Sequence, residues 1–376
     1  MQQRFKLRLD DLDSPALLLD WASTNPILVK PISMHSDNTK TSYRSETISS
    51  PSLFLNEFTA REEIGSRKKK SLGGTRVKAI ILPKLNWLLL HTPVFIAIAP
   101  VQLTILLLRG LYWWPQNPWR LSCEYICKIA HKAGRPHQAN QVYQQLLTNL
   151  TGAVKNYAHL YGSGLDSVLE QVQLSNADAA RMNQLVEEYG GVLLMVPHNF
   201  GTTFSVPEIH GKIPLLVVVR NPATIERTKV AIDFYERLQI KIIMVRGGNP
   251  FELSRTLFSV LKNGKAVIAT VDSLDRSANR IEVNMFDTQI GFDPWAAKIG
   301  ARLKLPVVPS YFKSQGRQVS VVLGAPLVSG DASELMQHYI SFFEQNIVED
   351  PASWAFLADK NWIKALRKVS SRLDNS

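Results

Sequence analysis

The chain has 376 residues, of which 45% are hydrophobic, and its 43 lysines and arginines outnumber 32 aspartates and glutamates to give a formal net charge of +11. This length allows one large domain or two of ordinary size, and the hydrophobic content excludes a fully disordered chain, a multi-span transporter and a collagen-like fibre. The basic excess favours an anionic partner, and composition alone leaves nucleic acid, phospholipid headgroups and an acidic carrier protein open.

The first 78 residues differ in composition from the rest of the chain. The stretch at 33–52 is rich in serine, threonine and charged residues without a sustained hydrophobic period, and a basic run follows at 67–70. Such segments bury too little apolar surface to offset the entropy of folding. We therefore predict that residues 1–78 form a disordered or loosely ordered N-terminal tail.

The most hydrophobic segment, Leu85–Leu108, contains no aspartate, glutamate, lysine or arginine. A basic flank precedes it and four aromatic residues follow it: Tyr112, Trp113, Trp114 and Trp119. These features indicate a membrane anchor, with a buried core helix as the competing interpretation. Pro93 and Pro100 disfavour a straight helix, so a bent hairpin within one leaflet is as good an interpretation as a span. We assign residues 79–118 to this membrane-anchor segment.

Residues 119–376 have the pattern of one α/β domain. Continuous apolar runs that alternate with helical segments predict a largely parallel central sheet flanked by helices on both faces. The expected strands are Val192–Val196, Ile213–Val219, Ile242–Val245, Ala266–Val271, Val307–Phe312 and Val319–Leu323. The expected helices cover 121–160, 176–189, 223–238, 251–262, 293–303 and 331–347.

His198 comes directly after the first strong strand and just before Gly201 and a pair of threonines suited to the start of a helix. In open α/β sheets the chemistry takes place beyond the carboxyl ends of the strands. A histidine at such a place can accept a proton from a hydroxyl group near neutral pH. A single histidine after a strand is more often structural, so the neighbouring motifs have to distinguish a catalytic from a structural role.

Several further motifs stand in a characteristic order around this histidine. They are Val219–Pro222, Phe234–Leu238, Leu261–Lys265, Ala269–Asp272, Lys304–Pro309 and Trp354–Leu357. Together with the segment Val192–Phe204, they resemble the lysophospholipid acyltransferase superfamily, in particular its lipid A late acyltransferase branch. The resemblance extends over about residues 80–370, and in that branch an acid stands five positions after the catalytic histidine.

The resemblance implies a membrane-associated O-acyltransferase on the cytoplasmic face of the inner or plasma membrane. His198 would be the general base that deprotonates a lipid or glycolipid hydroxyl, and the acyl thioester would be borne by acyl carrier protein or coenzyme A. No metal or bound cofactor is implied. The acid position of the family falls on the uncharged Thr203. Either Glu208 or Asp272 takes its place, or the chain is a catalytically weak or inactive lipid-binding relative.

Arginines at strand ends are candidates for binding phosphate, since a guanidinium can pair bidentately with its oxygens. Arg220 and Arg246 have this position, and a solvated loop arginine is the alternative interpretation. The full set of candidate substrate-binding residues is Asn199, Gly201, Thr203, Arg220, Arg237 and Arg246.

The C-terminal segment predicts a basic amphipathic helix. Its cations recur at helical spacing at Lys360, Lys364, Arg367, Lys368 and Arg372. Such a helix suits an anionic membrane or an acidic carrier, and equally a solvated helix packed on the core. Nucleic acid is disfavoured because no recognised nucleic-acid-binding module accompanies the charge. We predict no metal site, because the two cysteines, Cys123 and Cys127, lack further ligands at short spacing.

Overall fold

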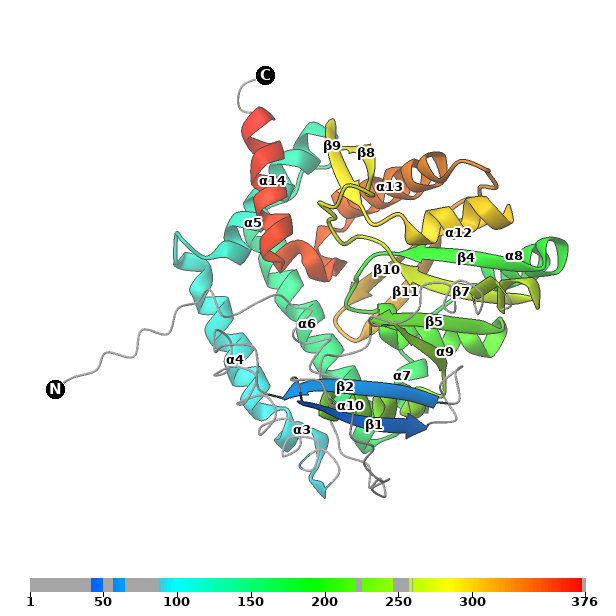
Figure 1. Ribbon diagram of the computed structural model, residues 1–376. Helices are drawn as coiled ribbons and strands as arrows, with labels where there is room; N and C mark the ends of the chain where they lie inside the picture. The colour runs from blue at the N-terminus through cyan, green and yellow to red at the C-terminus, as the bar shows by residue number, and fades with distance from the viewer. Residues whose placement is uncertain are drawn as a thin grey trace.

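The computed structural model describes residues 42–49, 57–64, 88, 91–220, 225–245, 257–258 and 260–373 (Figure 1). Within these residues, the central sheet has seven strands: β3 (Val172–Gln173), β4 (Gly191–Val196), β5 (Leu215–Arg220), β6 (Lys241–Val245), β7 (Lys265–Thr270), β10 (Val307–Gln315) and β11 (Gln318–Leu323). Their order is β3-β11-β10-β4-β7-β5-β6, and all neighbours are parallel except β10 and β11. The predicted, largely parallel sheet is confirmed, and each of the six expected strands belongs to it.

Helices cover both faces of this sheet. The helices are α3 (Val94–Ala97), α4 (Ala99–Gly110), α5 (Pro118–Lys132), α6 (Ala139–Gly162), α7 (Asp166–Leu169), α8 (Asn176–Tyr189), α9 (Thr202–Lys212), α10 (Ile225–Arg237), α12 (Trp295–Leu303), α13 (Ala332–Glu349) and α14 (Lys360–Leu373). Along β4, Leu193 and Met195 join one hydrophobic core, while Val192, Leu194 and Val196 join the other. Because both faces are buried, the strand is a continuous apolar run in the sequence.

The two cores have different helices. One contains residues of α5, α12, α13 and α14, the other contains residues of α8, α9 and α10, and the long helix α6 contributes to both. The helical region expected over 121–160 consists of the two helices α5 and α6, with Gly134 at a φ of 74° in the connection. The helix expected over 251–262 lies largely outside the described residues.

Two antiparallel strand pairs accompany the central sheet. The pair β8 (Ile281–Met285) and β9 (Thr288–Phe292) packs on α13 and was not expected from the sequence. The pair β1 (Ser42–Ser49) and β2 (Glu57–Ile64) lies in the segment for which composition predicts a loose tail. The other residues of 1–78 lie outside the described part of the chain.

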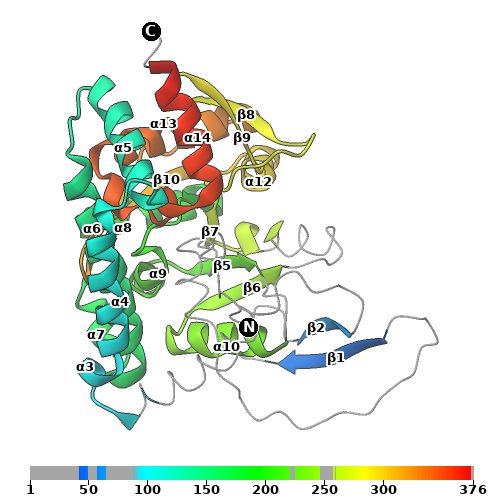
Figure 2. The same ribbon diagram turned by 90° about the vertical axis from the view of Figure 1, so that its left-hand side faces the viewer.

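The apolar segment before the domain is broken into short pieces. Pro93 precedes α3, and Pro100 stands in the first turn of α4, as expected for prolines that interrupt a helix. Figure 2 shows α4 along the outer side of α6, and Tyr143 of α6 donates a hydrogen bond to the carbonyl of Leu108 at 2.6 Å. Among the described residues, no helix has both the length and the apolar character needed to cross a bilayer.

Candidate active site

The carboxyl ends of β4 and β7 bring a histidine and an aspartate together. The two strands are parallel neighbours, with Val196 paired to Thr270, and His198 and Asp272 each stand two residues beyond this pair. The Nδ1 atom of His198 makes a short hydrogen bond with Oδ1 of Asp272. The backbone N–H of His198 donates to the other carboxylate oxygen, Oδ2, at 2.9 Å. Parallel register therefore places both residues at one edge of the sheet.

Two tryptophans from the C-terminal part of the chain complete the surroundings of Asp272. Trp354 donates its indole N–H to Oδ2 of Asp272 at 2.8 Å, and Trp362 donates to the backbone carbonyl of Asp272 at 2.9 Å. The two rings pack edge to face with their centroids 4.8 Å apart. Asp272 has no exposed surface, and a charge so deeply buried is tolerated only when donors surround it.

The imidazole ring of His198 is held from a second side by Phe356, which lies in the short helix η4 (Ala355–Ala358). The two rings stack with centroids 4.0 Å apart and planes 12° apart. With Nδ1 donating its proton to Asp272, the second ring nitrogen, Nε2, carries the free lone pair. The side chain is 25% exposed. The ring can therefore accept a proton from a molecule that approaches from outside.

Asn199 ties the segment after β4 to the C-terminal part of the chain. It is fully buried, and its side chain donates to the carbonyl of Ser353 at 3.1 Å and accepts the N–H of Phe312 at 3.3 Å. The carbonyl of His198 itself accepts the N–H of Ala355 at 2.8 Å. These contacts fix the position of His198 relative to Trp354, which lies between Ser353 and Ala355. The structure gives Asn199 backbone partners, and its expected contact with substrate stays a prediction.

Three further candidates lie on the helix that follows His198 or directly before it. Gly201 lies so close to β11 that a Cβ atom there would stand 2.4 Å from a methyl carbon of Val319. Thr203 is half-buried in the first turn of α9. Glu208 forms an ion pair with Lys212 at 3.0 Å, one turn further along the helix, and makes no described contact with His198. Of the two carboxyl groups that could replace the family's acid, the structure brings Asp272 to the histidine.

Of the three candidate arginines, Arg237 is the one whose side chain the structure describes. Arg237 pairs with Asp233 at 3.1 Å, and its guanidinium lies over the ring of Tyr161 at 4.4 Å. Arg220 ends β5, and its side chain lies outside the described part of the structure, as does all of Arg246. Binding of phosphate by Arg220 and Arg246 remains a prediction.

Sequence reasoning missed the roles of Trp354, Phe356 and Trp362 around the dyad. The motif Trp354–Leu357 stood out in the sequence, but nothing indicated which polar group its indole would meet. The partner, Asp272, is 82 positions away in the chain.

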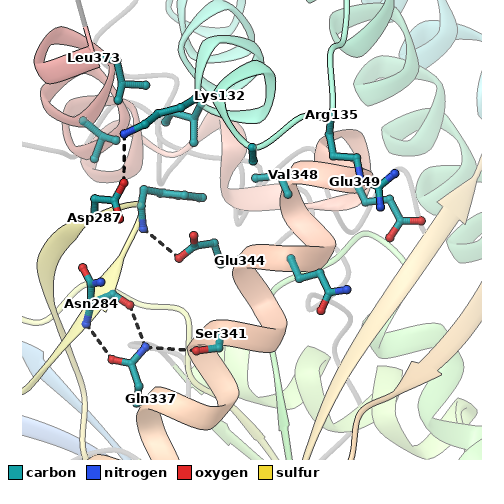
Figure 3. A pocket seen from close by; sticks show the side chains of 15 residues that line it. Lys132, Arg135, Asn284, Asp287, Gln337, Ser341, Glu344, Val348, Glu349 and Leu373 are labelled. Carbon is teal, nitrogen blue, oxygen red and sulfur yellow. Dashed lines mark hydrogen bonds and ion pairs between the residues drawn. The ribbon is translucent and has the colours of Figure 1, made fainter. Parts of the chain in front are cut away.

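A cavity of about 560 Å³ lies elsewhere, between α5, α13, α14 and the β8–β9 hairpin (Figure 3). Its charged lining residues are of both signs: Lys132, Arg135, Asp287, Glu344 and Glu349. Glu344 accepts the backbone N–H of Phe286 at 2.9 Å, and burial raises the pKa of its carboxyl group. Neither His198 nor Asp272 lines this cavity, so the dyad has its own surroundings.

Comparison with known families decides what kind of site the dyad belongs to. The family model of bacterial lipid A biosynthesis acyltransferases matches residues 165–362, which are 198 of the 376 residues. The chain belongs to this family. The matched segment includes His198 and Asp272 and ends at Trp362, so it contains every group described around the dyad. Membership indicates an acyltransferase that acts on lipid. No curated protein matches the chain.

Proposed function

We propose that this lipid A acyltransferase-family protein transfers a fatty acyl group from an acyl thioester to a hydroxyl group of a lipid or glycolipid. His198 is the general base and Asp272 is its acid partner. The observation that carries the proposal is the hydrogen bond between Nδ1 of His198 and a fully buried carboxylate. This is the arrangement by which a carboxylate orients a histidine and stabilises its protonated form.

The reaction balances with the groups of the dyad. As the hydroxyl oxygen of the acceptor attacks the thioester carbonyl, its proton moves to Nε2 of His198, and the positive ring is stabilised by Asp272. The carbon–sulfur bond then breaks, and the thiolate takes the proton from Nε2. The products are an ester and a free thiol, and the histidine returns to its starting form.

The alternative of an inactive lipid-binding relative depended on the lack of an acid at Thr203. Asp272 supplies a carboxylate to the ring from the neighbouring strand, so the uncharged Thr203 is no longer an argument against activity. The buried donors around Asp272 further support a working dyad, because they hold its carboxyl group in place next to the ring of His198.

The test is an acyl-transfer assay. Purified protein is incubated with acyl carrier protein or coenzyme A bearing a labelled fatty acid, together with a bacterial lipid extract. We expect label in the lipid fraction, and a rate at least about 10³-fold lower for His198→Ala, since the base is lost. Equal transfer by both proteins would overturn the role of His198. No transfer by the wild type with either donor would favour the lipid-binding alternative.

We further propose that the protein associates with a membrane through the helices before the domain. Large apolar side chains on α3, α4 and the turn after them are 38–79% exposed: Phe95, Ile96, Leu103, Leu106, Leu107, Leu111 and Trp113. From residue 65 to 123 the sequence has nine lysines and arginines and no acidic residue. Exposed apolar groups next to tryptophan and positive charge suit an anionic lipid interface.

Sedimentation with phosphatidylglycerol vesicles tests this association. The variant combines Leu103→Ser, Leu106→Ser and Leu107→Ser, whose side chains are 60–65% exposed and therefore contribute little to the fold. We expect weaker binding in this variant, because three apolar groups no longer enter the interface. The vesicle concentration at which half of the protein is bound should rise at least about tenfold. Unchanged binding would contradict the assignment of this surface.

A further inference from the structure

Helix α14 has one face in the core and the other covered with positive charge. Trp362, Leu366 and Val369 are at most 3% exposed. The opposite face presents five exposed cations, which we call the α14 basic ridge: Lys360, Lys364, Arg367, Lys368 and Arg372. The helix contains no acidic residue, and the ridge extends over about 18 Å at 1.5 Å per residue.

Three described acidic groups on elements around α14 already have partners. Helix α5 packs along α14 (Figure 1), and its Glu124 pairs with Arg120 of the same helix at 2.7 Å. Asp359 accepts the backbone N–H groups of Asn361 and Trp362 at the start of α14. Asp287, in the β8–β9 turn, pairs with Lys132.

The central cations of the ridge are therefore available to a partner. Lys364, Arg367 and Lys368 form no ion pair with any residue in the described part of the structure. At one end of the ridge, Arg372 donates to the hydroxyl group of Thr288 at 3.1 Å.

The same helix is connected directly to the dyad. It begins two residues after η4, whose Phe356 stacks on the ring of His198. Trp362, on its buried face, donates a hydrogen bond to the carbonyl of Asp272. A partner bound to the ridge would therefore lie on the outer face of the helix whose inner face holds Asp272.

We propose that the α14 basic ridge is the docking surface for an acidic acyl carrier protein that delivers the acyl thioester. The proposal rests on the proposed function, because it concerns the donor of that reaction. Carboxylates of a folded acidic protein would pair with the free cations and raise the rate of encounter. Because a carrier protein holds its thioester on a flexible arm, it can dock on the outer face of α14 while the thioester reaches His198.

The chemistry of the ridge favours a protein partner over a lipid surface. Helices that bind the membrane interface insert an apolar face among the lipids. The apolar face of α14 is packed inside the protein, whereas α4 exposes leucines to the outside. A surface that is cationic without exposed apolar side chains binds through charge alone, as a weak and rapidly exchanging donor complex requires.

The experiment compares a protein-borne donor with a small neutral one. In the full-length protein, the reversal variant combines Lys364→Glu, Arg367→Glu and Lys368→Glu, and a milder variant has glutamine at the same positions. The control combines Lys241→Glu, Lys262→Glu and Lys298→Glu, which changes the net charge equally at exposed lysines of other elements. Each protein is assayed with acyl carrier protein and with acyl-N-acetylcysteamine as donors.

We expect the KM for the acyl carrier protein to rise at least about tenfold in the reversal variant and less in the glutamine variant, with kcat retained. Rates with acyl-N-acetylcysteamine should stay within twofold, and the control should behave as the wild type. An unchanged KM for the carrier protein would overturn the proposal. An equal loss with both donors would also overturn it, because the ridge would then not act on the protein-borne donor.

Two binding measurements separate this proposal from the proposed function. Fluorescence anisotropy of labelled acyl carrier protein should show binding to the wild type and loss of binding in the reversal variant, even if no transfer is detected. In that case the docking surface stands and the proposed reaction fails. If the reversal variant binds the carrier protein normally but no longer binds phosphatidylglycerol vesicles, the ridge is a lipid surface and the proposal is wrong.

Discussion

Two carboxyl groups in the protein, those of Asp272 and Glu344, have opposite surroundings. Asp272 is completely buried, and N–H groups from His198 and Trp354 converge on its two oxygens. Glu344 is half-buried beside the 560 Å³ cavity, accepts one backbone N–H, and has its pKa raised by burial. The comparison shows that convergence of donors on a carboxylate, rather than the volume of a neighbouring cavity, distinguishes the candidate catalytic site.

The difference has a physical cause. A carboxylate removed from water keeps its charge only when hydrogen-bond donors replace the lost solvent. Around Asp272 these donors come from the residues after β4 and from the segment that contains Trp354, so two distant parts of the chain hold one carboxyl group next to His198. Glu344 accepts one donor, the N–H of Phe286, and burial outweighs this bond and favours its neutral form.

Removal of the charge at Asp272 is the strongest test of this comparison. In Asp272→Asn an amide group can face Nδ1 of His198, and the tautomer with the free lone pair on Nε2 is then no longer favoured. The corresponding change in a serine protease triad lowers turnover about 10⁴-fold, so we expect kcat to fall by about 10³–10⁴-fold. Initial rates of labelled acyl transfer measure this, and circular dichroism checks the fold. A kcat within threefold of the wild type would contradict the role of Asp272.

The two tryptophans offer a matched pair for the next test. Trp354→Phe removes a donor to the carboxylate of Asp272, whereas Trp362→Phe removes a donor to its backbone carbonyl. Both rings are almost fully buried, so both variants lose similar packing and should be destabilised alike. We expect kcat to fall about tenfold further in Trp354→Phe, because hydrogen bonds to charged groups are the stronger ones.

The unfolding free energies of both tryptophan variants, measured in urea, provide the control. If both variants lose the same stability and the same activity, the indole of Trp354 is a packing residue only. If the loss of kcat in the two variants follows their loss of unfolding free energy, a role of Trp354 in positioning Asp272 is likewise disproved.

The sequence predicted much of this architecture and only part of the site. The six long strands were predictable from their apolar runs, which in β4 and β7 reflect burial on both faces of the sheet. His198 was predictable from its place after β4, but Asp272 could only be one of two alternatives, since strand register decides which carboxyl group reaches the ring. The donor Trp354 is far away in the chain, and no local pattern encodes a contact of that range.

The β8–β9 hairpin was missed for a different reason. Its two turn residues, Phe286 and Asp287, have φ values of 53° and 55°, a conformation that asparagine and glycine usually occupy. The usual sequence signal of a tight hairpin is therefore absent. The boundary between α5 and α6 at Gly134 was missed because the sequence has helical periodicity on both sides of it.

Thr203 stands at the position where the family motif has its acid, and it allows a further test of Asp272. The resemblance places an acid at this position, yet the carboxylate that meets His198 is Asp272. We therefore expect kcat of Thr203→Ala to lie within about twofold of the wild type in the acyl-transfer assay. We also expect that Thr203→Glu does not restore activity to Asp272→Asn. Recovery to more than a tenth of the wild-type rate would show that the family's acid position is functional in this fold.

The smallest expected effect is a change in the unfolding free energy on replacement of Glu344. Because the pKa of its carboxyl group is higher in the folded protein than in the unfolded chain, its contribution to stability is complete below the unfolded value, near 4.3, and is lost as the pH rises through the folded value. Glutamine keeps the acceptor for Phe286 but does not titrate. Glu344→Gln should therefore match the wild type at pH 4 and exceed it by less than about 1 kcal/mol at pH 7, since the group is only half-buried. Urea unfolding at both pH values measures this difference in unfolding free energy. If Glu344→Gln is more stable than the wild type by the same amount at pH 4 and pH 7, the cost of burying the charge of Glu344 is not the cause.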